Sequence, residues 1–448
     1  PIFYKDGLSV YTTLDSRMQR HANRAVQEHL AEIQPLFNKE WDWSKKENIS
    51  ILKKAIEKNI REKPQYKKAT AHQRDSIATS LRNNPAFVDS VKKIAQTIET
   101  GVIVIDPRTG EIRAMVGGSN FRSFKYGLNH TTQIKRQPGS SFKPFVFTVA
   151  IDNGYPASYE ILNQPVTVML PEGRWTPQNY DNDIGGKYTI RNGIKYSINL
   201  VAVRAIMEIA PKEQVVQYAK RMGIESRIPL YESISLGTSL VTPLEMASAY
   251  GVYANEGVHV KPTAIIRIED KNGTVIEKSY PEKKEVLSKE TTYLMTSMLQ
   301  GVVESGGTGS RVRNYFHYPA AGKTGTTQSY ADAWFVGYTP QLVASVWAGF
   351  DDQQIHFANS DGAGGKSAAP LWGRLMQYIY ADKSINLPLE YFQQPSGIIE
   401  EAICSETKKL ATEFCPNKET EIFNAKYPPQ KCDKHTSADS KEENSNGF

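Results

Sequence analysis

The chain has 448 residues, of which 40% are hydrophobic and 23% charged, and its net charge is +6. This is the composition of a soluble globular protein with two or three domains, and its small positive charge fits a solvated surface better than a nucleic-acid patch. No apolar run approaches the ~20 residues that a membrane span needs. The chain begins at Pro1 in mid-pattern, without a signal peptide, so we interpret it as part of a longer protein.

The first hundred residues predict a strand followed by helices. Residues 8–16 begin as a β-prone run, and Asp15 or Ser16 can cap the next helix, in which apolar residues recur at helical spacing from Met18 to Leu30. Residues 39–99 are rich in Lys, Glu and Gln and contain patches with a helical period. We therefore expect a helical, solvent-facing insertion or linker there.

From Gly101 onward the pattern changes to a mixture of strands and helices. Two β-prone runs joined by a Pro-Arg-Thr-Gly turn predict a hairpin at 102–116, and three further runs predict a meander at 320–350. Between them we expect a mostly helical stretch (141–254), strands (261–280) and a helix (289–303), with a last helix at 369–381. Strands at both ends and helices between them predict an α+β fold with an antiparallel sheet flanked by helices.

We expect three regions: 1–99, a catalytic domain at 100–385, and a C-terminal tail at 386–448 whose last fifteen residues are disordered. The tail contains all three cysteines, Cys404, Cys415 and Cys432. A disulfide and free surface thiols are equally compatible with this count. His435 follows Cys432 without forming a paired motif, so the sequence predicts no metal site and no cofactor.

One segment has the pattern of an activated nucleophile. A serine hydroxyl needs an adjacent base, and a lysine three residues later on the same helical face can supply one. Ser140 and Lys143 have this spacing, and Pro138-Gly139 before them is typical of a helix start. The helix N-terminus would add partial positive charge beside the serine.

Two later motifs make this assignment specific. Ser197-Ile198-Asn199 follows inside the helical stretch, and Lys323-Thr324-Gly325 follows where strand patterns resume. This ordered set is typical of penicillin-binding proteins and, with Asp in the middle of the second motif, of class A β-lactamases. Three other serines also have a lysine three residues later but lie outside the helical stretch: Ser50, Ser90 and Ser405.

The chain resembles the C-terminal part of class A penicillin-binding proteins of the 1A type over nearly all of residues 7–385. Besides the three motifs, the phrases similar to this family are residues 7–15, 105–118, 175–180 and 236–250. The resemblance implies a penicillin-binding, serine β-lactamase-like fold with a five-stranded antiparallel sheet. The glycosyltransferase domain of this family is not in the sequence, so we do not expect this chain to polymerise glycan strands.

The resemblance also implies roles for the motif residues in peptidoglycan DD-transpeptidation. Ser140 would attack the carbonyl between the last two D-Ala residues of a stem peptide, and Lys143 would take its proton. Ser197 would relay a proton to the leaving amine, and Asn199 would orient Lys143 and the substrate amide. The substrate's terminal carboxylate would lie on the Lys323–Thr326 strand, which comprises Lys323, Thr324, Gly325 and Thr326.

The same resemblance implies partners and a location. The substrates would be peptidoglycan stem peptides on a lipid-linked precursor polymer, and β-lactams would be covalent inhibitors. Because stem peptides lie outside the cytoplasmic membrane, we expect the parent protein to be anchored upstream of Pro1, with this part on the periplasmic or extracytoplasmic face. Trp175 and Tyr180 are more readily explained as core or rim aromatics than as substrate contacts, and Trp334 is expected beside the Lys323 strand.

Three alternatives stay open. A D-Ala-D-Ala carboxypeptidase would differ only in using water as the acceptor. A serine β-lactamase would need a Glu, followed shortly by Leu-Asn, between the second and third motifs, whereas the similar Glu160–Asn163 segment precedes Ser197. A non-catalytic β-lactam sensor could keep Ser140 and Lys143 without turnover.

Overall fold

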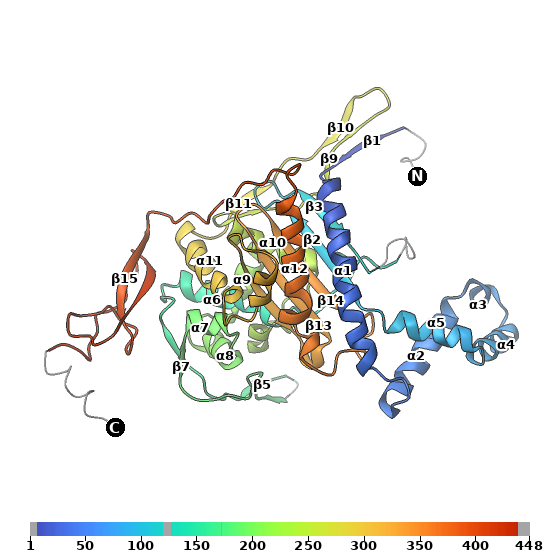
Figure 1. Ribbon diagram of the computed structural model, residues 1–448, viewed down its shortest axis with the longest axis horizontal. Helices are drawn as coiled ribbons and strands as arrows, with labels where there is room; N and C mark the ends of the chain where they lie inside the picture. Colours follow the sequence, from blue (N-terminus) through green and yellow to red (C-terminus); the bar gives the residue numbers. More distant parts are fainter. Residues whose placement is uncertain (1–6, 120–126, 172, 438–448) are drawn as a thin grey trace.

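The computed structural model describes residues 7–119, 127–171 and 173–437, and a five-stranded antiparallel sheet lies at its centre (Figure 1). The strands lie in the order β12 (Ala321–Thr326), β13 (Asp332–Tyr338), β14 (Val343–Gly349), β2 (Glu99–Ile105) and β3 (Ile112–Val116). Strand β14 pairs with β2 along its full length, from Val343↔Ile105 to Gly349↔Glu99. The predicted hairpin and meander therefore join into one sheet, and the expected fold class is confirmed.

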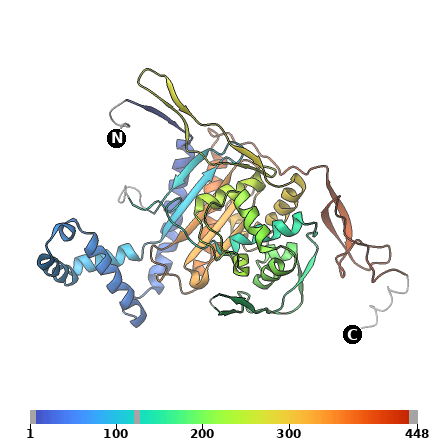
Figure 2. The same cartoon turned by 180° about the vertical axis from the view of Figure 1, so that it is seen from behind.

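Alternating side chains bury both faces of this sheet. On β2, Val102 and Val104 point into one hydrophobic core, whereas Ile103 and Ile105 point into the other. Helices α1 (Ser16–Glu40) and α12 (Gly364–Ala381) cover the first face, which is nearest the viewer in Figure 1. The other face, seen from behind in Figure 2, carries the helices of the middle of the chain. These are α6 (Lys143–Asp152), α7 (Ile190–Lys195), α8 (Asn199–Glu208), α9 (Lys212–Arg221), α10 (Pro243–Ala254) and α11 (Lys289–Val303).

The N-terminal region is helical, as expected from its pattern. Asp15 caps α1 by accepting hydrogen bonds from the N–H groups of Arg17 and Met18. The four helices that follow project away from the sheet in Figure 1 and are mostly exposed. They are α2 (Lys46–Glu62), α3 (Pro64–Lys68), α4 (Ala71–Arg82) and α5 (Pro85–Ala95).

Several strands depart from the sequence expectations. The strands expected at 261–280 form, with β1 (Ser9–Thr12), a separate three-stranded sheet of β9 (Ile265–Glu269) and β10 (Val275–Lys278). Helix α12 begins at Gly364, five residues before the expected start. The sequence patterns also gave no sign of six short strands: β4 (Glu160–Leu162), β5 (Val168–Leu170), β6 (Gly173–Trp175), β7 (Lys187–Thr189), β8 (Val258–Val260) and β11 (Lys283–Glu285).

Residues 394–437, which we name the C-terminal lobe, contain a hairpin that the sequence did not predict. Strands β15 (Ile398–Cys404) and β16 (Lys418–Asn424) pair over seven residues each. Glu421 of this hairpin accepts two hydrogen bonds from the guanidinium of Arg191 on α7, at 2.5 and 2.7 Å. The disorder expected for the last fifteen residues falls mostly on 438–448, which lie outside the described residues.

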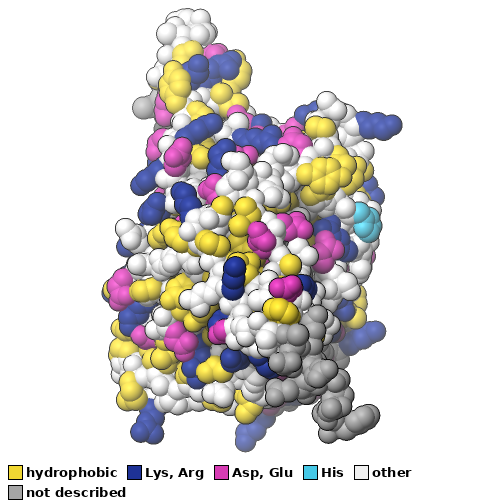
Figure 3. Space-filling model, turned by 90° about the vertical axis from the view of Figure 1, so that its left-hand side faces the viewer, with side chains coloured by type: hydrophobic (Ala, Val, Ile, Leu, Met, Phe, Trp, Pro, Cys, Tyr) yellow, Lys and Arg dark blue, Asp and Glu magenta, His cyan; other side chains and the backbone are white. Residues whose placement is uncertain are grey.

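The surface carries no concentrated charge on the face that Figure 3 shows, which is the end of the molecule bearing the C-terminal lobe. Positive and negative side chains are interspersed there. Among the described residues, no helix is both long and apolar enough to cross a membrane.

Candidate active site

Ser140 lies in a tight turn that leads directly into a buried helix. Residues Gly139–Phe142 form a short 3-10 helix (η2), and Lys143 is the first residue of α6. The serine therefore stands just before the α-helix rather than inside its first turn, which refines the predicted position. Ser140 is half-buried, whereas every residue of α6 up to Ile151 is buried.

Two glycines let this turn lie against strand β12. Gly139 has φ +55°, and a Cβ there would come within 2.6 Å of the Thr326 carbonyl oxygen. A Cβ on Gly325 would come within 2.1 Å of the Pro138 carbonyl oxygen. Neither position has room for a side chain, and L-residues rarely adopt the backbone conformation of Gly139. The backbone of the nucleophile turn and that of the Lys-Thr-Gly strand are therefore in contact.

Ser197 lies on the connection between α7 and α8 in a conformation unusual for a residue with a side chain. Its φ is +60°, and such left-handed residues are enriched at functional sites. Two backbone hydrogen bonds fix the turn: Ser197 N–H to the Ile194 carbonyl at 3.2 Å, and Ile198 N–H to the Gly193 carbonyl at 3.0 Å. Asn199 then begins α8.

The amine of Lys143 is completely buried and contacts both residues of the second motif. Its Nζ lies 2.6 Å from the Ser197 carbonyl oxygen, 2.7 Å from Asn199 Oδ1 and 3.3 Å from Ser197 Oγ. A neutral amine has two N–H bonds, and the two shorter contacts use both of them. The nitrogen lone pair then stays available to accept a proton.

Lys323 approaches the same serine from the sheet side. Its Nζ lies 2.8 Å from Ser197 Oγ and 3.2 Å from the Thr324 carbonyl oxygen. Ser197 Oγ is therefore within hydrogen-bond distance of two buried lysines, one on α6 and one on β12. A hydroxyl can donate one hydrogen bond while it accepts others, so it can pass a proton between neighbours.

Burial changes the protonation of both lysines. Burial, followed by the positive charge of Lys323, holds the pKa of Lys143 well below its usual range. Burial lowers the pKa of Lys323 to about 7. Desolvation disfavours the charged form of an amine, and a nearby like charge adds to this effect. Both shifts favour the neutral form of the amine, which is the form that can accept a proton.

Asn179 is a positioning residue to which the sequence patterns assigned no role. It is buried, and its Oδ1 accepts hydrogen bonds from the N–H groups of Asn199 at 2.9 Å and Leu200 at 3.0 Å. Its Nδ2 donates to Asn163 Oδ1 at 2.7 Å. Asn179 therefore caps α8 from outside the helix. The available signal was a cap-type side chain inside the phrase at 175–180, which carries part of the family resemblance.

The remaining predicted residues lie on or near β12. Thr324 Oγ1 lies 2.7 Å from Thr308 Oγ1, and Thr326 Oγ1 accepts a hydrogen bond from the Gly364 N–H at 3.0 Å. Trp334 is buried on β13 opposite Gly325, as expected.

The predicted aromatic residues near the motifs differ in exposure. Trp175 is half-buried on β6. Tyr180 is exposed, and its hydroxyl contacts that of Tyr330, which follows the Lys-Thr-Gly strand. This contact joins the loop between β6 and β7 to the segment that follows β12.

The other serines with a lysine three residues later lie elsewhere. Ser50 and Ser90 are exposed on α2 and α5, and Ser405 belongs to the C-terminal lobe. Only the segment from Ser140 to Lys143 meets both later motifs. A half-buried serine three residues before a buried amine, with a second buried amine on strand β12, has the groups that acyl transfer needs.

The sequence left open whether the tail cysteines form a disulfide or are free thiols at the surface. All three cysteines are buried and free. His435, for which the sequence showed no paired motif, lies among their sulfur atoms.

Comparison with known protein families identifies the family to which this chain belongs. A model of the penicillin-binding protein transpeptidase domain matches residues 100–377. A model of the C-terminal domain of penicillin-binding protein 1A matches residues 394–437. The chain belongs to the penicillin-binding protein transpeptidase family, as the sequence resemblance implied.

Penicillin-binding proteins of the 1A type are similar to this chain over more than the transpeptidase domain. Penicillin-binding protein 1A of Aquifex aeolicus is 31% identical over 417 residues, which cover 87% of this chain and 56% of the relative. The Pseudomonas aeruginosa protein of the same name is 32% identical over 385 residues, covering 74% of this chain and 46% of the relative. The chain thus spans about half the length of these relatives.

Solved structures share the fold. Penicillin-binding protein 1A from Haemophilus influenzae superposes with a TM-score of 0.73 at 24% identity, covering 95% of this chain and 73% of that chain. PonA1 from Mycobacterium tuberculosis, solved in complex with penicillin V, gives a TM-score of 0.64 at 23% identity and covers 88% and 90% of the two chains.

Proposed function

We propose that this chain is a peptidoglycan DD-transpeptidase that forms an acyl-enzyme on Ser140. The observation that carries this proposal is the position of Ser197 Oγ, 3.3 Å from Lys143 Nζ and 2.8 Å from Lys323 Nζ. The three motif residues are on different elements, and this arrangement links a base to a carboxylate-binding cation through one hydroxyl. Membership of the penicillin-binding family supports D-Ala-D-Ala ends as the substrate.

Acylation begins with proton transfer from Ser140 to neutral Lys143. The serine oxygen bonds to the penultimate D-Ala carbonyl carbon, and negative charge develops on the carbonyl oxygen. The backbone N–H groups of Ser140 and Thr326 are assigned to that oxygen, since the Gly139 and Gly325 contacts bring the two segments together. Donors of this kind stabilise the transition state by roughly 3–4 kcal/mol each.

The leaving amine requires a proton, and Ser197 is the relay that delivers it from Lys143. The C–N bond breaks, D-Ala departs as a free amino acid, and Ser140 carries the acyl group. An acceptor amine of a second stem peptide then attacks the ester, gives up a proton through the same relay and releases Ser140. The reaction exchanges one amide for another, which explains why it needs no cofactor or redox partner.

Lys323 is assigned to the terminal carboxylate of the substrate. A carboxylate beside Nζ favours the charged form of this lysine and offsets the effect of burial on its pKa. Thr324 and Thr326 add hydroxyls on the same strand, and Gly325 keeps the strand free of a side chain beside the nucleophile turn. Substrate binding would thus fix the protonation of the second lysine.

Two observations favour transpeptidation over β-lactam hydrolysis. Glu160, in the segment that superficially matches the β-lactamase pattern, lies on β4 with Lys187 3.9 Å from its carboxylate. Asn163 of the same segment is buried and supports Asn179 instead. A deacylating glutamate is therefore not supplied by this segment, and a β-lactam ester on Ser140 is expected to persist for many minutes.

Location and partners follow from the substrate. We infer that the catalytic domain works on the periplasmic or extracytoplasmic side of the membrane, on stem peptides of a lipid-linked polymer, within a parent protein anchored there. Detection of the parent protein as a soluble cytoplasmic species would contradict this location.

Intact-protein mass spectrometry after exposure to penicillin tests the proposal. We expect one covalent adduct per chain, on the tryptic peptide containing Ser140. Ser140→Ala should abolish it, and Ser405→Ala, which changes a serine with the same lysine spacing, should leave it unchanged. Label on another serine would overturn the site, and rapid loss of label with release of hydrolysed drug would favour a β-lactamase.

A further inference from the structure

The three cysteines and one histidine of the C-terminal lobe form a compact buried cluster. Cys404 ends β15, Cys415 lies in the loop between the two strands, and Cys432 and His435 lie after β16. Their exposed fractions are 0%, 4%, 3% and 1%, respectively. Four ligand-type side chains from three separate segments therefore meet away from solvent.

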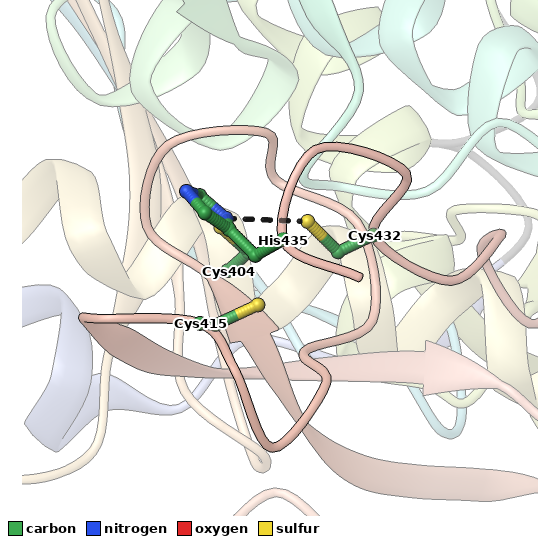
Figure 4. Close-up of side chains that lie close together, drawn as sticks. All are labelled: Cys404, Cys415, Cys432 and His435. Carbon is green, nitrogen blue, oxygen red and sulfur yellow. Dashed lines mark hydrogen bonds between the residues drawn. The ribbon is translucent and has the colours of Figure 1, made fainter. Parts of the chain in front are cut away.

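The donor atoms converge on one point (Figure 4). His435 Nδ1 lies 3.4 Å from Cys404 Sγ and 3.5 Å from Cys432 Sγ, and all four donor atoms lie within 4.8 Å of one another. Around a tetrahedral zinc ion, with ordinary Zn–S and Zn–N lengths, sulfur and nitrogen are about 3.6 Å apart and two sulfurs about 3.8 Å apart. The cluster therefore needs only small shifts to reach that geometry.

The lobe has little else to hold its loops together. The buried cluster of its loops consists of the three cysteines, with only Ala411 packed against them as a partly buried apolar residue. The other buried apolar side chains of the lobe, Ile398, Ile403 and Phe423, belong to the hairpin. A unit of this size cannot rely on so small an apolar core, and small domains of this kind use disulfides or metal ions instead. A disulfide would use two of the three sulfurs and leave the imidazole aimed at a thiol.

Neighbouring groups are suited to thiolates and an oriented imidazole. The Thr412 N–H donates a hydrogen bond to Cys415 Sγ at 3.2 Å, and the Thr407 hydroxyl donates to Cys432 Sγ at 3.4 Å. Glu406 Oε2 lies 3.0 Å from His435 Nε2, although the two atoms are not aligned for a hydrogen bond. A carboxylate beside the distal nitrogen is the usual partner of a metal-binding histidine.

We propose that Cys404, Cys415, Cys432 and His435 bind one zinc ion as a closed, structural Cys3His site. Binding converts three thiols to thiolates, releases three protons to solvent and leaves a complex of net charge −1. All four positions are filled by protein, so no position remains for water or substrate. The ion would fix the loops of the C-terminal lobe and thereby the hairpin that contacts α7.

Metal analysis of the whole chain, purified without added metal or chelator, tests this site. Elemental mass spectrometry should find about one zinc per chain. After exchange, Co²⁺ should give the charge-transfer and d–d absorption of a tetrahedral thiolate complex. Removal with a strong chelator should open the lobe to protease while the domain at 100–377 keeps its thermal transition.

Single substitutions identify the ligands. Cys432→Ser and His435→Ala should each lower bound zinc at least tenfold after dialysis against a weak chelator. Glu406→Gln should weaken binding by about 10–100-fold without abolishing it. Lys426→Ala, a change at an exposed position after β16 in the same lobe, is the matched control and should bind normally. Circular dichroism of each variant checks that the main domain is folded, and neither readout depends on acylation of Ser140.

Two results would overturn the zinc site. One is metal-free protein in which two cysteines resist alkylation until a reductant is added, because this identifies a disulfide. The other is metal-free protein with three reactive thiols and a lobe that resists protease to the same degree with and without added zinc.

Discussion

In the domain at 100–377, two lysines are buried between a five-stranded sheet and its helices, where two large clusters of apolar side chains pack on the two faces of the sheet. In the C-terminal lobe, three cysteines and a histidine are buried with almost no apolar support. In the first region, close packing keeps Lys143 and Lys323 away from water. In the second region, the three cysteines and His435 themselves fill the centre of the loops.

A buried polar group therefore has a different meaning in a large apolar core and in a small one. Where the surrounding core is large, an amine that loses its hydration is held by packing and changes its pKa, which creates a base. Where the core is small, donor atoms that converge without another reason indicate a ligand-binding site. Substitution of the lysines should therefore change the acylation of Ser140 and leave the C-terminal lobe folded. Substitution of the cysteines or His435 should unfold the lobe and leave acylation unchanged.

The largest effect is expected for Lys143→Met, which removes the base and keeps an apolar side chain of similar length. The acylation rate constant for penicillin should fall about 10²–10⁴-fold, the usual contribution of a general base. The melting temperature should fall by about a few degrees at most, because removal of a buried amine offsets the lost hydrogen bonds to the Ser197 carbonyl and Asn199 Oδ1. Stopped-flow acylation and calorimetry measure the two quantities. Lys53→Met, in the exposed Ser-x-x-Lys segment of α2, should change neither.

Lys323→Ala should lower the acylation rate constant at least about tenfold, since a charge-assisted hydrogen bond typically contributes 1.5–3 kcal/mol. A penicillin ester has no free carboxylate. Comparing it with the acid therefore separates the loss of carboxylate binding from a general disturbance of the active site. The variant should lose much less rate with the ester than with the acid. Equal losses for both compounds would show that Lys323 does not act on the carboxylate.

The same variant should change the pH profile of acylation in a defined direction. Lys143 must be neutral to act, so the rate rises with pH as it loses its proton. The positive charge of Lys323 is the second cause of the low Lys143 pKa. Removing that charge raises the Lys143 pKa, so the acid limb should move to higher pH. The alkaline limb, assigned to Lys323 with its pKa of about 7, should disappear. An unmoved acid limb would contradict the coupling of the two lysines.

Sequence patterns predicted the central sheet because its strands are β-branched runs that bury both faces, as Val102 and Ile103 illustrate. The pairing of β14 with β2 could not be read from local pattern, since it joins segments far apart in the chain. The motif residues were found because their order is specific, and the structure brings Lys143, Ser197 and Lys323 together.

The missed features depend on tertiary contacts. Asn179 has a role only because its loop returns to the start of α8. The cysteine cluster was missed because its members come from three segments at spacings unlike a paired zinc motif. Strand β15 has three exposed residues in succession at its centre, so it shows no period-two pattern.

The smallest effect on acylation is expected for a change where the two regions meet. Glu421→Ala removes the carboxylate that accepts both Arg191 hydrogen bonds and leaves the guanidinium with only Ser297 Oγ, 3.1 Å away. The free energy for opening the hairpin should fall by about 1.5–3 kcal/mol, measured by hydrogen exchange of the β15 and β16 amides. Glu401→Ala, which removes the same charge from the position opposite Glu421, is the control and should not destabilise the hairpin. Acylation of Ser140 should be unchanged in both variants, because the catalytic lysines are held by the main domain. A slower acylation in Glu421→Ala alone would show that the lobe supports the active site through α7.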